Sequence, residues 1–195
     1  MNSHDTVFDY IVIGSGFGGS VSAMRLAEKG YSVLVLERGK HFRDQDFPQT
    51  NWNLRRFVWF PLLRCFGIMQ FTTLKGVLVL RGSGVGGGSL VYGNVLMQPS
   101  DKLFEAPGWR DLADWRTLLA PHFETARRML GVAPNPRLWA ADDVLRAIAA
   151  ERGNGHTFRA TEVGVYFNED DPGATVSDPY FGGDGPDRAG CTHCG

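Results

Sequence analysis

Apolar positions near the start of the chain fall into two short runs with a helical pattern between them. Residues 10–13 and 31–36 are apolar runs rich in β-branched side chains, which is typical of short strands buried on both faces. From about residue 18 to residue 29 the apolar positions recur at helical spacing, and Gly30 is placed to end that helix. The pattern predicts a strand–helix–strand unit.

The same reasoning predicts further elements along the chain. Residues 77–80 form another apolar run and are expected to be a strand. Two amphipathic helices are expected at about 115–130 and 141–153, and Asp114 is placed to cap the first of them. Residues 162–168 are expected to form a strand, and the remaining tail, rich in Gly, Pro and Asp, is expected to be loop.

The turn between the first strand and its helix is rich in glycine. It consists of Gly14, Ser15, Gly16, Phe17, Gly18 and Gly19. In a dinucleotide-binding turn the first glycine permits the tight turn, the second lets a pyrophosphate approach the backbone, and the third lets the helix pack on the strand. Glu37, at the end of the second strand, can accept hydrogen bonds from two ribose hydroxyls and disfavours a 2′-phosphate. The alternative is a glycine-rich turn without a cofactor, and this motif alone does not separate FAD from NAD.

A second segment concentrates glycine as well. The chain has 25 glycines among 195 residues, and six of them lie between Gly82 and Gly93, directly after the strand predicted at 77–80. A flexible linker is the alternative, but linkers are polar, whereas this segment continues into LVYGNVLM. A simple NAD domain needs no second loop of this kind. The segment therefore favours a dinucleotide with a second large ring system.

Taken together, these motifs resemble a known family. GSGFGGS with LERG, and GSGVGGGSLVYGN, are similar to the glucose–methanol–choline (GMC) family of FAD oxidoreductases, in particular its bacterial cholesterol-oxidase-type branch. The stretch DPYFGGDGP at 178–186 is also similar to that branch. The resemblance implies an α/β, Rossmann-like FAD-binding domain over residues 7–135, with the β-α-β unit at 9–37 and the second loop at 81–95. It further implies that 136–195 begin a substrate domain and that the chain is incomplete.

The resemblance also implies a set of residues that bind FAD. Those in the first loop would lie against the pyrophosphate, Glu37 would hold the adenosine ribose, and those in the second would line the flavin end. The full set is Gly14, Ser15, Gly16, Phe17, Gly18, Gly19, Glu37, Val85, Gly88, Ser89, Tyr92, Gly93, Asn94 and Val95. The family usually has Asn or His where this chain has Tyr92, which leaves Asn94, two residues on, as the substitute.

The implied activity is oxidation of a secondary alcohol, a 3β-hydroxysteroid, to the ketone by hydride transfer to flavin. The electron acceptor would be oxygen or another compound. The family's catalytic His and its Asn or His neighbour have no counterpart in these residues and are expected in a C-terminal half, so this fragment alone is expected to be inactive. Two alternatives stay open: a truncated FAD-binding remnant without catalysis, and an NAD-dependent Rossmann dehydrogenase.

Cys191 and Cys194 form a C-x-x-C pair at the end of the sequence. Pairs at this spacing bind zinc or iron–sulfur clusters, or exchange disulfides. The resemblance implies further cysteines in a run like that of iron–sulfur ligands. The alternative to a metal site is a structural pair of buried thiols.

Charge and hydropathy restrict the partners. The net charge of −1 gives no basic footprint for nucleic acid, and no run approaches the roughly 18 apolar residues of a membrane span. The first ten residues lack a signal-peptide pattern, so a cytoplasmic location is expected. The aromatic stretch at 47–71, which includes Trp59, is expected to pack in the core or to touch a membrane surface as part of a lid over an apolar substrate.

Overall fold

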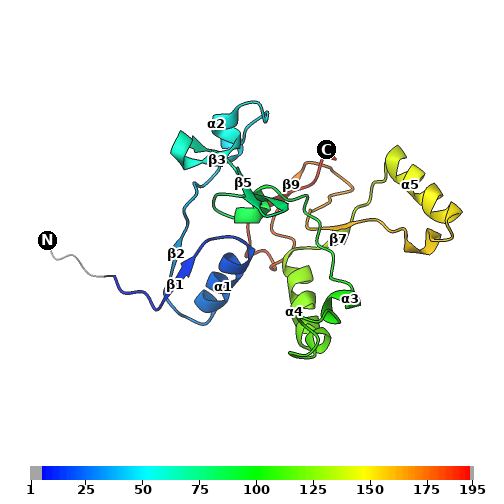
Figure 1. The fold of residues 1–195 in the computed structure, drawn as a ribbon, viewed down its shortest axis with the longest axis horizontal. Coiled ribbons are helices and arrows are strands. Elements are labelled where there is room, and N and C mark those ends of the chain that lie inside the picture. The colour runs from blue at the N-terminus through cyan, green and yellow to red at the C-terminus, as the bar shows by residue number, and fades with distance from the viewer. Residues whose placement is uncertain (1–5, 194–195) are drawn as a thin grey trace. The chain divides into compact units, whose positions relative to one another are not determined.

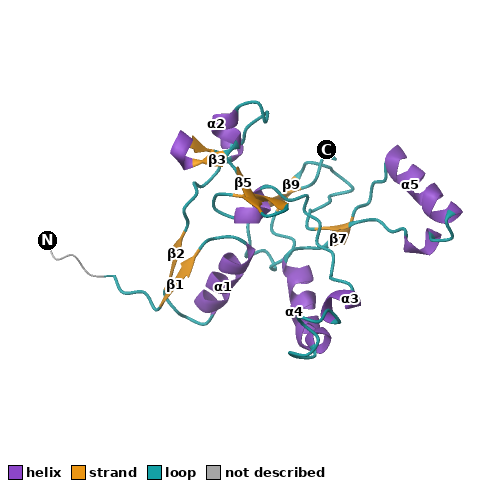
Figure 2. Cartoon of the chain, viewed as in Figure 1, coloured by secondary structure: helices purple, strands orange, loops and turns teal. Residues whose placement is uncertain are grey.

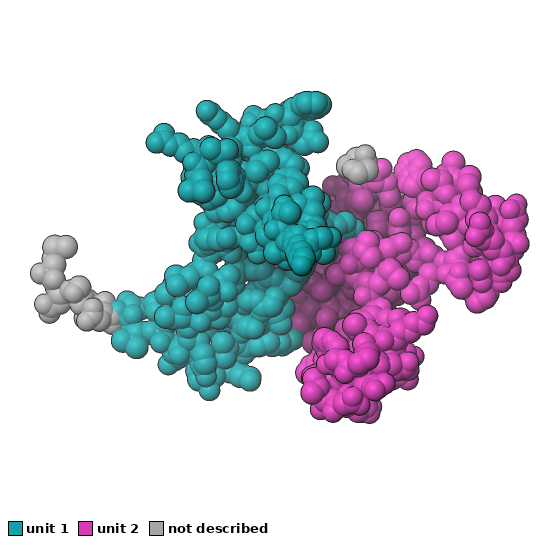
Figure 3. Space-filling model, in the orientation of Figure 1, with its two compact units in different colours: residues 1–93 teal, residues 94–195 magenta. Residues whose placement is uncertain are grey.

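The computed structural model describes residues 6–193 (Figure 1). Short helices and strands are joined by long loops (Figure 2). The chain forms two compact units, residues 1–93 and residues 94–195 (Figure 3). The sequence predicted a boundary after residue 135, between a cofactor domain and a substrate domain. The division into compact units does not test that functional boundary, which stays a prediction.

The first unit begins with the predicted strand–helix–strand motif. Strand β1 (Tyr10–Ile13) leads into helix α1 (Phe17–Glu28), and the chain returns in strand β2 (Val33–Leu36) (Figure 1). The two strands are parallel, with Tyr10 opposite Val33 and Ile13 opposite Leu36. Two parallel strands need a crossover connection, and α1 provides it here. This is the Rossmann-like α/β arrangement expected from the sequence.

Two antiparallel hairpins complete this unit. After the short helix α2 (Leu54–Phe57), strand β3 (Trp59–Phe60) pairs with β4 (Cys65–Phe66), and the turn between them is a 3-10 helix at Pro61–Leu63. Strand β5 (Met69–Leu74) then pairs with β6 (Val77–Gly82). The strand predicted at 77–80 is confirmed. Its hairpin partner was not predicted.

The second unit contains three helices and four two-residue strands among its described residues. The helices are α3 (Asp101–Phe104), α4 (Trp115–Met129) and α5 (Ala140–Glu151). The strands pair as β7 (Ala133–Pro134) with β8 (Glu162–Val163), and β9 (Thr175–Val176) with β10 (Arg188–Ala189). Helices α4 and α5 confirm the predicted ones, and the Asp114 side chain accepts a hydrogen bond from the backbone N–H of Thr117, as expected of a helix cap.

The strand predicted at 162–168 was wrong in length. Only Glu162 and Val163 pair as a strand, because β7 offers two residues to pair with. Beyond them the chain bonds to loops: Gly164 N–H donates to the carbonyl of Asn94, and the carbonyl of Tyr166 accepts from Cys191 N–H. The tail expected to be loop also holds the short β9–β10 pair.

Few apolar side chains are buried. Among the described residues, the buried hydrophobic ones are Phe42, Trp59 and Ile68. In contrast, Ile11 and Ile13 of β1 are 61% and 87% exposed, although their sequence pattern is that of a strand buried on both faces. Over residues 6–193, none of the helices has the length and apolar character needed to cross a membrane.

Candidate cofactor site

The first glycine turn has the geometry that a dinucleotide-binding turn requires. Gly14 has a φ of +90°, a conformation that side-chain-bearing residues rarely adopt, and its N–H donates to the carbonyl of Leu36. At Gly19, a Cβ atom would lie 1.9 Å from the carbonyl oxygen of Gly14. The first and third glycines of the motif therefore make the turn and the helix–strand contact for which the sequence predicted them.

The N-terminus of α1 is open to an anion. Gly16 is the residue before the helix, no side chain caps it, and the first turn contains no acidic residue. A Cβ atom at Gly16 would come no closer than 4.0 Å to another residue, the nearest atom being the Gly87 Cα. Free N–H groups and the helix dipole favour a phosphate at such a position. The residues present thus fit the pyrophosphate of a dinucleotide.

Glu37 is already engaged by the protein. Its Oε2 accepts from the N–H of Ser15 at 2.9 Å and from the Ser15 hydroxyl at 2.8 Å, and its Oε1 accepts from the N–H of Gly39 at 2.8 Å. Burial opposes ionisation of this carboxyl, but these donors outweigh it and hold its pKa below the ordinary value. A carboxylate has about four acceptor positions, two on each oxygen. Oε2 already accepts two hydrogen bonds and Oε1 only one, so a ribose hydroxyl is expected to donate to Oε1.

The second glycine segment turns back on itself after β6. Gly84, Gly86 and Gly87 have positive φ, and a 3-10 helix follows at Gly87–Leu90. At Gly82, a Cβ atom would lie 2.0 Å from the carbonyl oxygen of Gly87. This segment, like the first, depends on direct contact between backbone atoms, and it is not a flexible linker.

The two glycine segments meet within the first unit. The N–H of Gly86 donates to the Ser15 hydroxyl at 3.1 Å, and a Cβ atom at Gly87 would lie 2.9 Å from the Cα of Gly16. Gly88 lies against the ring of Phe17, where a Cβ atom would approach to 2.9 Å, and that ring packs edge-on against Tyr92 with 5.3 Å between ring centroids. The contact could not be predicted from the sequence, because Ser15 and Gly86 are 71 residues apart in the chain. It brings most of the predicted site residues of the first unit together.

A hollow of about 310 Å³ lies between these segments. It is lined by Ile13, Gly14, Leu36, Glu37, Arg38, Arg81, Gly82, Ser83, Gly84 and Gly87. Three polar lining residues were missed from the sequence: Arg38, Arg81 and Ser83. The Arg38 guanidinium donates to Gln70 and, at 3.4 Å, to the Ser83 hydroxyl, and it lies over the Trp59 ring. The sequence could have indicated Arg38 as a lining residue, because it directly follows Glu37.

The predicted flavin-end residues are divided between the two units. Val85, Gly88, Ser89, Tyr92 and Gly93 belong to the first unit. Asn94 and Val95 belong to the second, where Asn94 has a φ of +55° and its carbonyl accepts from Gly164, and Val95 pairs with Val163. The role of this set in contacting a flavin stays a prediction.

The predicted metal site has no support among the described residues. The N–H of His193 donates to the Sγ of Cys191 at 3.4 Å, and the His193 ring stacks on Phe167 with 5.5 Å between centroids. Cys194 lies outside residues 6–193. Within that range, no three His, Cys, Asp or Glu side chains are placed to hold a metal ion.

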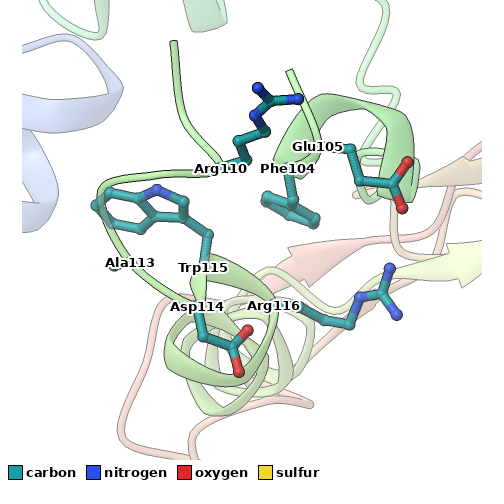
Figure 4. Close-up of a pocket in the computed structure, with 7 residues that line it drawn as sticks. All are labelled: Phe104, Glu105, Arg110, Ala113, Asp114, Trp115 and Arg116. Atoms are coloured by element: carbon teal, nitrogen blue, oxygen red, sulfur yellow. The ribbon is translucent and has the colours of Figure 1, made fainter. Parts of the chain in front are cut away.

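The second unit has a hollow of its own, which no sequence pattern pointed to. Its volume is about 570 Å³, and its lining includes Phe104 and Trp115 together with charged side chains (Figure 4). Arg110 pairs with Asp111 and Arg116 with Asp101, while Asp114 caps α4. Of the four charged lining residues, Arg110, Asp114 and Arg116 already have partners, and among the described residues only the Glu105 carboxylate has none, so the hollow presents no cluster of free groups for chemistry.

A carboxylate organises the tail of the second unit. Asp178 is buried, and it accepts hydrogen bonds from the backbone N–H groups of Tyr180, Phe181, Gly183 and Gly185. Burial opposes ionisation, but the four donors prevail and lower its pKa. The DPYFGGDGP stretch is thus a loop wrapped around one carboxylate.

The strand–helix–strand motif, its glycine turn and the open helix N-terminus define a Rossmann-type dinucleotide-binding unit. Consistent with this, the family of NAD(P)-binding Rossmann-like domains matches residues 12–48.

Curated relatives extend the comparison to nearly the whole chain. It is 51% identical over 191 residues to a cholesterol oxidase of Mycobacterium tuberculosis, covering 96% of this chain and 33% of that protein. It is 44% identical over 197 residues to a cholesterol oxidase of Acinetobacter baumannii, covering 100% of this chain and 35% of that protein. An uncharacterized GMC-type oxidoreductase of M. tuberculosis is 33% identical over 133 residues, which are 66% of this chain and 20% of that protein. The chain belongs to the GMC oxidoreductase family, as its motifs predicted, and it spans about a third of the length of the cholesterol oxidases it matches.

Proposed function

We propose that the first unit is the FAD-binding part of a GMC oxidoreductase. The observation that carries this proposal is the meeting of two glycine segments, one at the N-terminus of α1 and one after β6, around a hollow that contains Glu37. Family membership supports FAD over NAD. In this proposal the N–H groups at the start of α1 hold the pyrophosphate, Gly16 lets it approach, and Glu37 accepts from a ribose hydroxyl.

For the whole protein we propose oxidation of a secondary alcohol, a 3β-hydroxysteroid, to the ketone. The relatives named cholesterol oxidases support this substrate class. Bound FAD supplies a two-electron acceptor for the hydride leaving the alcohol carbon, and the hydroxyl proton must pass to a base. No residue among 6–193 is assigned as that base. The contribution of the described residues is to bind and orient the cofactor.

Gly16→Ala tests the cofactor site. The added methyl fits the protein, since its nearest neighbour would be 4.0 Å away, but it would occupy the space of the pyrophosphate. We expect the full-length protein to bind FAD and the variant to bind it at least about tenfold more weakly, a difference of roughly 1.4 kcal/mol. The measurement is titration with FAD, followed by flavin fluorescence. Gly108→Ala, at an open position of the second unit, is the matched control and should bind FAD as the wild type does.

Other outcomes separate the alternatives. A wild-type protein that reduces NAD without binding FAD would contradict the proposal. FAD binding without oxidation of any 3β-hydroxysteroid would contradict the proposed activity and favour a non-catalytic FAD-binding protein. Equal FAD affinity in the wild type and in Gly16→Ala would show that the first glycine turn does not contact the pyrophosphate.

The turn between β3 and β4 supports the proposed contact with a membrane surface. Leu62 and Leu63 are 87% and 68% exposed in that turn, and Arg64 follows them. The sequence contains no Asp or Glu between Asp46 and Asp101, so the surroundings of the turn in the chain carry only positive formal charge. An exposed apolar tip flanked by cations suits an anionic lipid surface. For Trp59 the sequence left core packing and a membrane contact open, and its exposure of only 8% agrees with core packing.

Replacing Leu62 and Leu63 together by serine tests the membrane contact. We expect the double variant to lose most of its co-sedimentation with vesicles containing phosphatidylserine, because the apolar tip no longer inserts. Binding of the wild type should also weaken as salt is raised. Leu112→Ser, at a 73% exposed position of the second unit, is the control and should bind like the wild type. Undiminished binding of the double variant would show that this turn does not contact lipid.

A further inference from the structure

The Ser15 hydroxyl lies where three separate segments of the first unit meet. It donates to Glu37 Oε2 at 2.8 Å, at the end of β2, and it accepts from the N–H of Gly86 at 3.1 Å, in the second glycine segment. Gly86 is 71 residues further along the chain. One hydroxyl therefore joins the first glycine turn to both of the other segments.

The directions of these hydrogen bonds follow from chemistry. An ionised carboxylate accepts only, so the hydroxyl hydrogen of Ser15 must point to Glu37. A lone pair of the hydroxyl oxygen is then free for the Gly86 N–H, which can only donate. Because the negative charge polarises the hydroxyl, both bonds are stronger than those between neutral groups. The charge of Glu37 thus acts on the second segment through Ser15.

A parallel set of contacts starts from the other carboxylate oxygen. Glu37 Oε1 holds the N–H of Gly39, and Gly39 lies directly on the second segment, since a Cβ atom there would be 2.4 Å from the Gly84 nitrogen. One residue further, the Lys40 carbonyl accepts from the N–H of Val85 at 3.1 Å. Both oxygens of Glu37 therefore connect the end of β2 with residues 84–86.

We infer that Ser15 is a positioning residue that holds the second glycine segment on the first, through Glu37, before the cofactor binds. Its hydroxyl fixes residues 86–88 near Gly16 and Phe17, where the proposed pyrophosphate site lies. The expectation that Ser15 raises the affinity for FAD rests on the proposed function. The expectation that Ser15 holds the second glycine segment in place does not, because it concerns hydrogen bonds within the cofactor-free protein.

Ser15→Ala in the full-length protein without FAD tests this inference. Removing the hydroxyl leaves the Gly86 N–H without its acceptor, so hydrogen exchange at that amide should become about tenfold faster, as for loss of one charge-assisted bond. FAD affinity should fall by a similar factor, about tenfold. Ser22→Ala, at an exposed position of α1, is the matched control and should change neither quantity. Ser15→Thr keeps a hydroxyl and should restore both.

A second variant covers the case in which Ser15→Ala does not fold. Glu37→Gln keeps the shape of the side chain but removes the charge that polarises Ser15, and it too should accelerate exchange at Gly86. Wild-type protection of Gly86 in a folded Ser15→Ala or Glu37→Gln protein would overturn the inference. Failure of the wild type to bind FAD would refute the proposed function alone, because exchange at Gly86 would still decide the role of Ser15.

Discussion

Replacing Gly19 by alanine is expected to unfold the strand–helix–strand motif or to destabilise it by roughly 3 kcal/mol, at the upper end of overpacking effects. The added Cβ would lie 1.9 Å from the carbonyl oxygen of Gly14 and 3.0 Å from its carbonyl carbon. Both are backbone atoms of a turn that cannot move aside without breaking the Gly14 hydrogen bond to Leu36. Urea denaturation of the full-length protein, followed by far-UV circular dichroism, measures the loss.

The neighbouring glycine provides the control for this substitution. Gly18 lies on the same helical turn, but a Cβ atom there meets nothing within 4 Å. Gly18→Ala should therefore leave stability unchanged or raise it by about 0.5–1 kcal/mol, through the higher helix propensity of alanine. Equal urea midpoints for the two variants would show that the close contact at Gly19 is not required for folding.

Gly82→Ala is expected to have an effect of similar size, roughly 3 kcal/mol, on the second glycine segment. Its Cβ atom would lie 2.0 Å from the carbonyl oxygen of Gly87 and 2.8 Å from the carbonyl carbon. Relief would require the segment to move away from β6, which would also pull Gly86 from Ser15. We therefore expect a lower melting temperature together with a loss of FAD binding.

Thermal unfolding and FAD titration of the same samples test this second expectation. Gly93→Ala is the matched control, because a Cβ atom at Gly93 has open space around it, and its melting temperature should equal that of the wild type. If Gly82→Ala melts with the wild type and keeps its FAD affinity, the backbone contact between Gly82 and Gly87 has no energetic importance.

Local sequence signals predicted the elements that local interactions form. Helix α1 and strands β1 and β2 agree with the predicted ones within about two residues. Gly30, predicted to end α1, has a φ of +88° and donates to the Ala27 carbonyl. The helix and its end depend on neighbours within a few residues, and each strand is visible as a local run of apolar residues, which is why the pattern contained them.

Features that depend on distant partners could not be predicted in the same way. The predicted length of β8 was wrong because the strand can pair only with the two residues of β7, and nothing in the sequence of 162–168 indicates that limit. Likewise, Glu37 looked like a free ribose ligand in the sequence, whereas Ser15 and Gly39 already bond to its carboxylate. Both glycine segments were recognised as motifs, but their contact was not.

The hydrogen bond between Ser15 and Gly86 also has a consequence for the order of folding. All residues of the strand–helix–strand motif have been made by residue 36, and its paired strands are separated by 23 residues, far fewer than those between the two glycine segments, so it can form first during synthesis. The junction with the second glycine segment closes a loop of 71 residues and must wait for that segment to emerge. A nascent chain is therefore expected to acquire its nucleotide-fold geometry well before the proposed FAD site, which is complete only after the later step.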